Sequence, residues 1–124
     1  MAAILVSPFY AIQIHRSFSR AHPYVMSETS WVASNARAIE EMRPRRWLEA
    51  LVSVLKQERT AEALEPPLAV ADPYPAITVH RMMCEEHEAI IGESDWLDAN
   101  TRLLQEEGKV WLNNLLSVLK GAYA

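Results

Sequence analysis

The sequence contains one group of residues that are common metal ligands, between positions 80 and 87. His80, Cys84 and His87 are spaced by four and three residues, so on a helix they would share one face. Histidine nitrogen and cysteine sulfur are ligands of zinc and nickel. Because two helical turns separate the histidines, Cys84 with either one would form half a site that a second helix must complete. The alternative is that these histidines bond to backbone or carboxylate groups on a half-buried stripe.

Two other groups of residues could carry chemistry. A nucleophile and its base must lie closer together than a spacing of three residues on one helix normally allows, which counts against Cys84 and His87 as such a pair. The acidic residues between positions 95 and 107 lack the paired E-x-x-E and E-x-x-D spacing of a magnesium-dependent helical hydrolase. The sequence therefore predicts no cofactor and no catalytic centre.

A short basic segment follows at positions 43–46. It reads Arg43-Pro44-Arg45-Arg46, and its proline favours a turn at this point. Most such segments are solvated loops. An acidic partner could also bind here, and we take Arg43, Arg45 and Arg46 as candidate contacts.

The elements that position these residues occur twice, because the chain matches itself when shifted by 65 residues. Beyond position 46 the shift becomes 64, so one residue is lost in the second copy. All four tryptophans and all four histidines pair with each other in this alignment. The identical pairs are Pro8/Pro73, Ala11/Ala76, Ile12/Ile77, His15/His80, Arg16/Arg81, His22/His87, Glu28/Glu93, Trp31/Trp96, Asn35/Asn100, Arg37/Arg102, Glu41/Glu106, Trp47/Trp111, Leu48/Leu112, Leu51/Leu115, Ser53/Ser117, Val54/Val118, Leu55/Leu119 and Lys56/Lys120.

Each copy is expected to form an extended lead-in and three helices. Apolar residues at three- and four-residue spacing predict the helices, and the single-residue deletion favours a turn between the second and third. The predicted ranges are about 10–22, 29–42 and 45–58 in the first copy, and 76–91, 95–107 and 109–121 in the second. Asn35 and Asn100 follow a tryptophan by four residues, and we expect them to cap a neighbouring helix or to specify register.

The predicted fold is an all-α, pseudo-twofold helical bundle built from a duplicated three-helix unit. It would be one domain over residues 1–124, with repeats at about 3–57 and 68–121 and a linker at 58–67. A unit of this length buries only a marginal core, so two units should pack on each other. The predicted core is Trp31, Ile39, Trp47, Leu48, Leu51, Val54, Leu55, Trp96, Leu104, Trp111, Leu112, Leu115, Val118 and Leu119.

Composition narrows the classes of partner. The formal net charge of −4 does not suit a nucleic-acid binder, which normally has a basic face. There is no run of 18 apolar residues, so we expect no membrane span. Cys84 is the one cysteine, which excludes an internal disulfide and favours a reducing compartment, the cytoplasm.

The function predicted from these features is a non-enzymatic protein–protein interaction module, such as a small regulator, adaptor or antagonist. Trp31 and Trp96 join the three arginines as candidate partner contacts, because the apolar content exceeds what a small core obviously needs. A homodimer is also possible. Two alternatives stay open: a zinc- or nickel-binding protein using His80, Cys84 and His87, and a small helical enzyme. The enzyme would need a polar pocket between the repeats, marked by a solvent-exposed cluster of Arg81, Glu93 and Asn100.

Overall fold

The computed structural model describes residues 6–59 and 68–121, and within them the protein is all-α, as predicted. Five α-helices and three short 3₁₀ helices occur in these ranges, and no strand does. In chain order they are η1 (Pro8–Tyr10), η2 (Arg16–Ser19), α2 (Glu28–Met42), α3 (Pro44–Lys56), α4 (Leu68–Ala71), η3 (Arg81–Cys84), α5 (Glu93–Glu107) and α6 (Lys109–Leu119).

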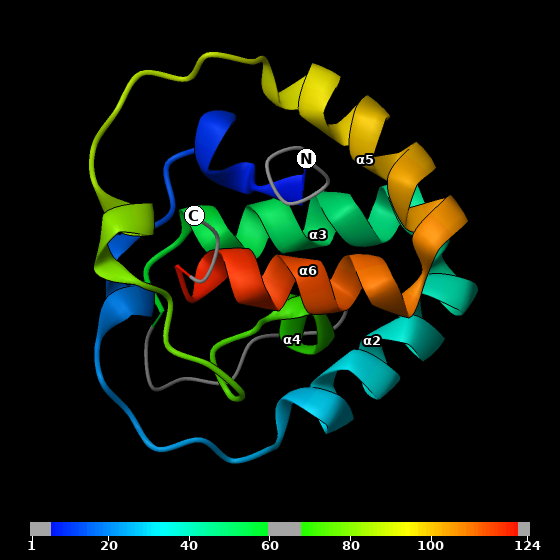
Figure 1. The fold of residues 1–124 in the computed structure, drawn as a ribbon, viewed down its shortest axis with the longest axis horizontal. Helices are drawn as coiled ribbons and strands as arrows, with labels where there is room; N and C mark the ends of the chain where they lie inside the picture. Colours follow the sequence, from blue (N-terminus) through cyan, green and yellow to red (C-terminus); the bar gives the residue numbers. More distant parts are fainter. Residues whose placement is uncertain (1–5, 60–67, 122–124) are drawn as a thin grey trace.

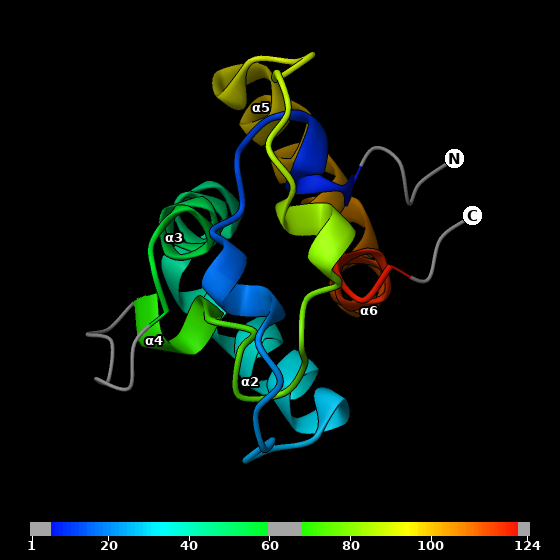
Figure 2. The same cartoon turned by 90° about the vertical axis from the view of Figure 1, so that its left-hand side faces the viewer.

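The helices form two corners, α2–α3 and α5–α6, and these corners exchange partners (Figure 1). Helix α3 packs against α5, and α2 packs against α6. Figure 2 shows α3 and α6 almost end-on, with the segments that contain η2 and η3 between them. Each helix of one corner therefore buries its apolar face against a helix of the other corner.

The core contains the residues that the sequence predicted, with one exception. Every predicted core side chain is at most 3% exposed apart from Ile39, which is half-buried. The rings of Trp47 and Trp111 meet edge to face in the centre, with 6.0 Å between centroids. Trp31 packs on Trp47 in a similar way, at 6.3 Å. Aromatic side chains thus join the two corners through the middle of the molecule.

The first predicted helix of each repeat is wrong. Ranges 10–22 and 76–91 are mostly extended, and each contains a single 3₁₀ turn, η2 or η3. The physical reason is tertiary hydrogen bonding: the backbone N–H of His15 donates to Leu55 O, and that of His80 donates to Leu119 O. Val79 N–H similarly donates to Phe18 O. These backbone groups bond to distant residues, so they are not used in a local helix.

The helices that form the corners agree with the sequence to within about two residues. Ser27 caps α2, because its hydroxyl accepts a hydrogen bond from the backbone N–H of Ser30. Pro44 occupies the first position of α3, where its missing N–H costs nothing. No described helix is both long enough and apolar enough to cross a membrane.

Candidate functional site

In each corner a buried asparagine is hydrogen-bonded to a tryptophan on each of the two helices, and we call this group the Trp–Asn–Trp brace. Asn35 on α2 donates to the backbone oxygen of Trp31 and accepts a hydrogen bond of 2.9 Å from the indole N–H of Trp47 on α3. Asn100 on α5 does the same with Trp96 and Trp111, at 3.0 Å. These bonds tie the two helices of a corner together in a site that excludes water, so the expectation that the asparagines specify helix register gains a physical basis.

The candidate partner contacts Trp31 and Trp96 are corrected by the structure. They are 1% and 2% exposed, so neither side chain can meet a partner on the surface. Each indole N–H instead donates to a backbone oxygen in the other half of the chain, Trp31 to Asp72 and Trp96 to Ser7. Both tryptophan side chains therefore belong to the core, and their indole hydrogen bonds link the two halves of the chain.

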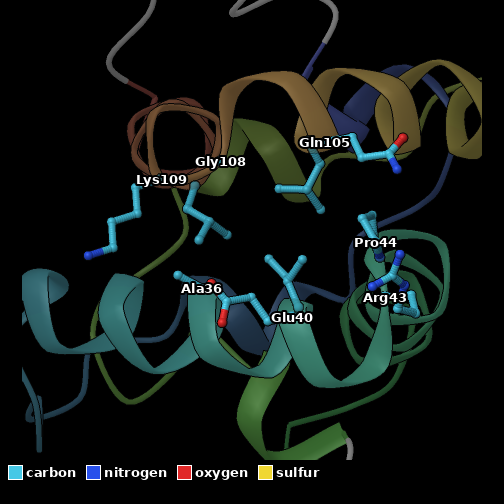
Figure 3. Close-up of a pocket in the computed structure, with 10 residues that line it drawn as sticks. Ala36, Glu40, Arg43, Pro44, Gln105, Gly108 and Lys109 are labelled. Atoms are coloured by element: carbon cyan, nitrogen blue, oxygen red, sulfur yellow. The ribbon is translucent and has the colours of Figure 1, made fainter.

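An open cleft of about 370 Å³ lies where the two corners meet (Figure 3). Its partly exposed apolar residues are Ala36, Ile39 and Pro44, whereas Leu104 and Leu112 are only 2% and 0% exposed. Its polar residues come from both corners. The full lining is Ala36, Ile39, Glu40, Arg43, Pro44, Leu104, Gln105, Gly108, Lys109 and Leu112. The cleft thus offers an apolar surface bordered by charges of both signs.

Arg43 forms the turn between α2 and α3 in an unusual backbone conformation. Its φ is +78° and its ψ is 151°. Arg43 N–H closes the last turn of α2 on Ile39 O, and a positive φ at this residue then turns the chain away from the helix. Pro44 requires an extended ψ in the residue before it. Glycine satisfies both requirements freely, whereas other residues do so at a cost of about 1–3 kcal/mol.

The corresponding turn between α5 and α6 contains Gly108, with a φ of +57°. This turn carries no such strain, since glycine adopts positive φ readily. The two corners therefore both turn at a residue with positive φ, which is an arginine in one corner and a glycine in the other. The corner with Arg43 retains a charged side chain at the cleft, and the other retains none at that position.

The three candidate arginines have different surroundings. Arg45 is half-buried and binds Glu49 on its own helix and Asp98 on α5, and the hydrogen bond to Asp98 raises the pKa of Arg45. Arg43 and Arg46 are exposed, and neither forms an ion pair or side-chain hydrogen bond with any described residue. Of these two, Arg43 lines the cleft.

A second hollow, of about 420 Å³, lies beside His22 and Tyr74. Its arginines already have partners: Arg20 lies 3.8 Å from Glu58, and Arg59 donates to the Asp72 carboxylate at 2.6 Å. Burial raises the pKa of Asp72, although the backbone N–H of Tyr74 and the charge of Arg59 oppose this. Both arginines of this hollow are therefore paired with carboxylates of the protein, whereas Arg43 in the cleft forms no ion pair with a described residue.

The proposed metal ligands His80, Cys84 and His87 do not share a helix face, because no helix spans them. His80 Nδ1 accepts a hydrogen bond from the backbone N–H of Met82 and so caps η3. Both ring nitrogens of His87 lie against backbone oxygens, those of Glu85 and Phe9. Among the described residues no group of three His, Cys, Asp or Glu side chains could hold a metal ion. The metal hypothesis loses the geometry on which it rested.

The cluster proposed for an enzyme is not assembled either. Asn100 is fully buried in its brace, and Glu93 pairs with Lys56 at 2.9 Å. Arg81 is exposed on η3. A solvent-exposed cluster of these three residues is therefore excluded by the burial of Asn100.

Comparison of the chain with models of known protein families, with curated proteins and with solved structures found no match. Sequence reasoning named Arg43 but missed the cleft, because its other wall comes from Gln105, Gly108 and Lys109, more than 60 positions away.

Proposed function

We propose that the protein is a single-domain module that arose by duplication, with repeats at about 3–57 and 68–121 joined by a linker at 58–67. The sequence alignment supports this, and so do reciprocal contacts between the halves. In a twofold interface, if one residue contacts a second, their counterparts make the same contact in reverse. A duplicated chain folded as a pseudo-dimer would contain such pairs of contacts.

Three pairs of contacts have this reciprocal form. Trp31 bonds to Asp72 as Trp96 bonds to Ser7. Lys56 pairs with Glu93 as Lys120 pairs with Glu28. The third is a stack of imidazole on an aromatic ring, formed by His22 on Tyr74 at 3.5 Å between centroids and by His87 on Phe9 at 3.9 Å. In each case a contact from the first repeat to the second is matched by the equivalent contact from the second repeat to the first, as between the subunits of a homodimer.

We infer that this module works by binding another protein at the cleft between the corners, as a small regulator, adaptor or antagonist without catalytic activity. The observation that carries this inference is the cleft itself: an open apolar surface with charged borders, held by buried Trp–Asn–Trp braces. Interaction sites commonly combine an apolar centre with a polar rim. The single cysteine keeps the cytoplasm as our expected location.

The test is affinity capture from the native host with the tagged full-length protein, with wild type compared with Arg43→Ala and Arg46→Ala. We expect one abundant protein at fixed stoichiometry with the wild type, and its loss or strong reduction with Arg43→Ala. Arg46→Ala is the matched control, because Arg46 follows the same turn but does not line the cleft. A wild-type protein that captures no partner at fixed stoichiometry would contradict the proposal.

A further inference from the structure

Arg43 combines a disfavoured backbone conformation with a side chain that has no ion-pair partner among the described residues. Its positive φ and extended ψ belong to a region of backbone space that is essentially restricted to glycine. Its guanidinium forms no ion pair within residues 6–59 and 68–121. No described ion pair of the guanidinium therefore offsets the backbone strain, whereas Gly108 at the matching turn avoids it. Such strain is often found at ligand-binding sites.

We propose that Arg43 binds a carboxylate of the partner protein, and that the cleft takes a segment in which this carboxylate lies beside an aliphatic side chain. The inference rests on the proposed function and specifies its ligand. A guanidinium presents parallel N–H donors that match the two oxygens of a carboxylate. The neighbouring aliphatic group would pack against Ile39, Ala36 and Pro44, which are the partly exposed apolar residues of the cleft.

The arrangement of charges in the cleft favours this occupant. In the view of Figure 3, Arg43, Pro44 and Gln105 lie at one end and Lys109 lies at the other, with Glu40 between them. The Arg43 end therefore offers guanidinium and amide donors together. Two cations against one carboxylate leave the cleft with a net positive charge, although the whole chain has a net charge of −4. An anionic group is complementary to this end of the cleft.

The test uses three small probes that share the leucine side chain and differ in the charge of their amino or carboxyl end. N-acetyl-L-leucine carries the carboxylate, N-acetyl-L-leucinamide is neutral, and L-leucinamide is a cation. Each is titrated into isotope-labelled full-length protein and followed by NMR at the Arg43 side chain and the methyl groups of Ile39, Leu104 and Leu112. We expect shifts at both places with the acid, at about millimolar affinity for a ligand this small, and at least tenfold weaker binding of the other two.

Variants at position 43 separate the effect of the guanidinium on binding from the effect of the backbone strain on stability. Arg43→Ala removes the guanidinium and keeps the disfavoured backbone, so binding of the acid should be lost with little gain in thermal stability. Arg43→Gly removes both, so binding should be lost while Tm rises by about 3–6 °C. Arg43→Lys keeps the charge without the planar fork and should bind several-fold more weakly. Arg46→Ala should bind the acid as the wild type does.

Several results would overturn the inference. These are acid binding that survives Arg43→Ala, equal binding of the neutral amide, or an unchanged Tm in Arg43→Gly. Preferred binding of L-leucinamide that disappears in Glu40→Gln would do so as well, since Glu40 would then be the recognition group. If Arg43→Ala still captures the native partner, this inference fails and the proposed function stands. If the wild type captures no partner, the proposed function itself fails.

Discussion

At the scale of single residues, the buried asparagines have the clearest structural role. Asn35 and Asn100 are 0% exposed, and each is bonded to two tryptophans. The sequence placed each asparagine on the same helix face as a tryptophan four residues earlier. It could not show that a second tryptophan, on the next helix, donates to the same amide, because that contact depends on the angle of the corner.

We expect Asn35→Ala and Asn100→Ala each to lower the free energy of unfolding by about 1–3 kcal/mol. Each substitution leaves a buried indole N–H, of Trp47 or Trp111, without its acceptor. Urea denaturation followed by tryptophan fluorescence measures the change. Asn113→Ala is the control, because Asn113 is exposed and bonds only within its helix, so it should have little effect. Equal effects at positions 35 and 113 would contradict the role of the brace.

The single thiol gives a second prediction at this scale. Burial raises the pKa of Cys84 to about 11, although a hydrogen bond from Ser19 opposes the rise. The thiol is therefore protonated below that pH, and the thiolate is the reactive form. We expect alkylation by iodoacetamide at pH 8 to be at least about 100-fold slower in the folded protein than in urea, and to accelerate as the pH rises. Rapid alkylation of the folded protein at pH 8 would show that Cys84 is accessible and ionised.

At the scale of elements, the corner helices could be predicted, whereas the first helix predicted in each repeat, at 10–22 and 76–91, does not form. Helices α2, α3, α5 and α6 follow the apolar period, and the positive-φ residues Arg43 and Gly108 separate the two helices of each corner. The segments that contain η2 and η3 have a similar spacing of apolar residues. Their backbone groups, however, bond to the C-terminal ends of α3 and α6. Such long-range bonds leave no local pattern, so the period suggested a helix where an extended segment forms.

The turn between α5 and α6 provides a test of the backbone argument. A Cβ added to Gly108 would meet no atom within 4 Å, but the φ of +57° would remain disfavoured. We expect Gly108→Ala to lower the free energy of unfolding by about 1 kcal/mol through backbone strain alone. Thermal unfolding measures this. An unaltered Tm would show that this turn relaxes to another conformation.

At the scale of the whole molecule, the two halves depend on contacts that each makes with the other. Helix α3 packs against α5 and α2 packs against α6, so neither corner encloses its own apolar face. The sequence predicted that the repeats would share a core. It did not indicate that the corners would exchange partners, or that a cleft would form between their turns, because both depend on segments far apart in the chain.

The ion pairs between the halves allow this exchange to be measured. Lys56 lies 2.9 Å from Glu93, and the matching pair Lys120 and Glu28 lies at 2.8 Å. We expect Lys56→Glu to destabilise the protein and the added Glu93→Lys to restore most of the loss. Because both residues are more than a third exposed, the coupling should be only about 0.2–1 kcal/mol and should shrink at high salt. A double-mutant cycle in urea measures it, and zero coupling at low salt would contradict this contact.

The claim that the cleft is the binding surface is tested most directly by photo-crosslinking in the native host. A photoreactive amino acid such as p-benzoylphenylalanine would replace Gln105 in the cleft or, as a control, exposed Glu86 beyond η3. We expect one protein to be crosslinked from position 105, the same protein that is captured at fixed stoichiometry, and the crosslink to be lost with Arg43→Ala. Crosslinking of that protein from position 86 and not from position 105 would show that the partner binds elsewhere and would contradict the account.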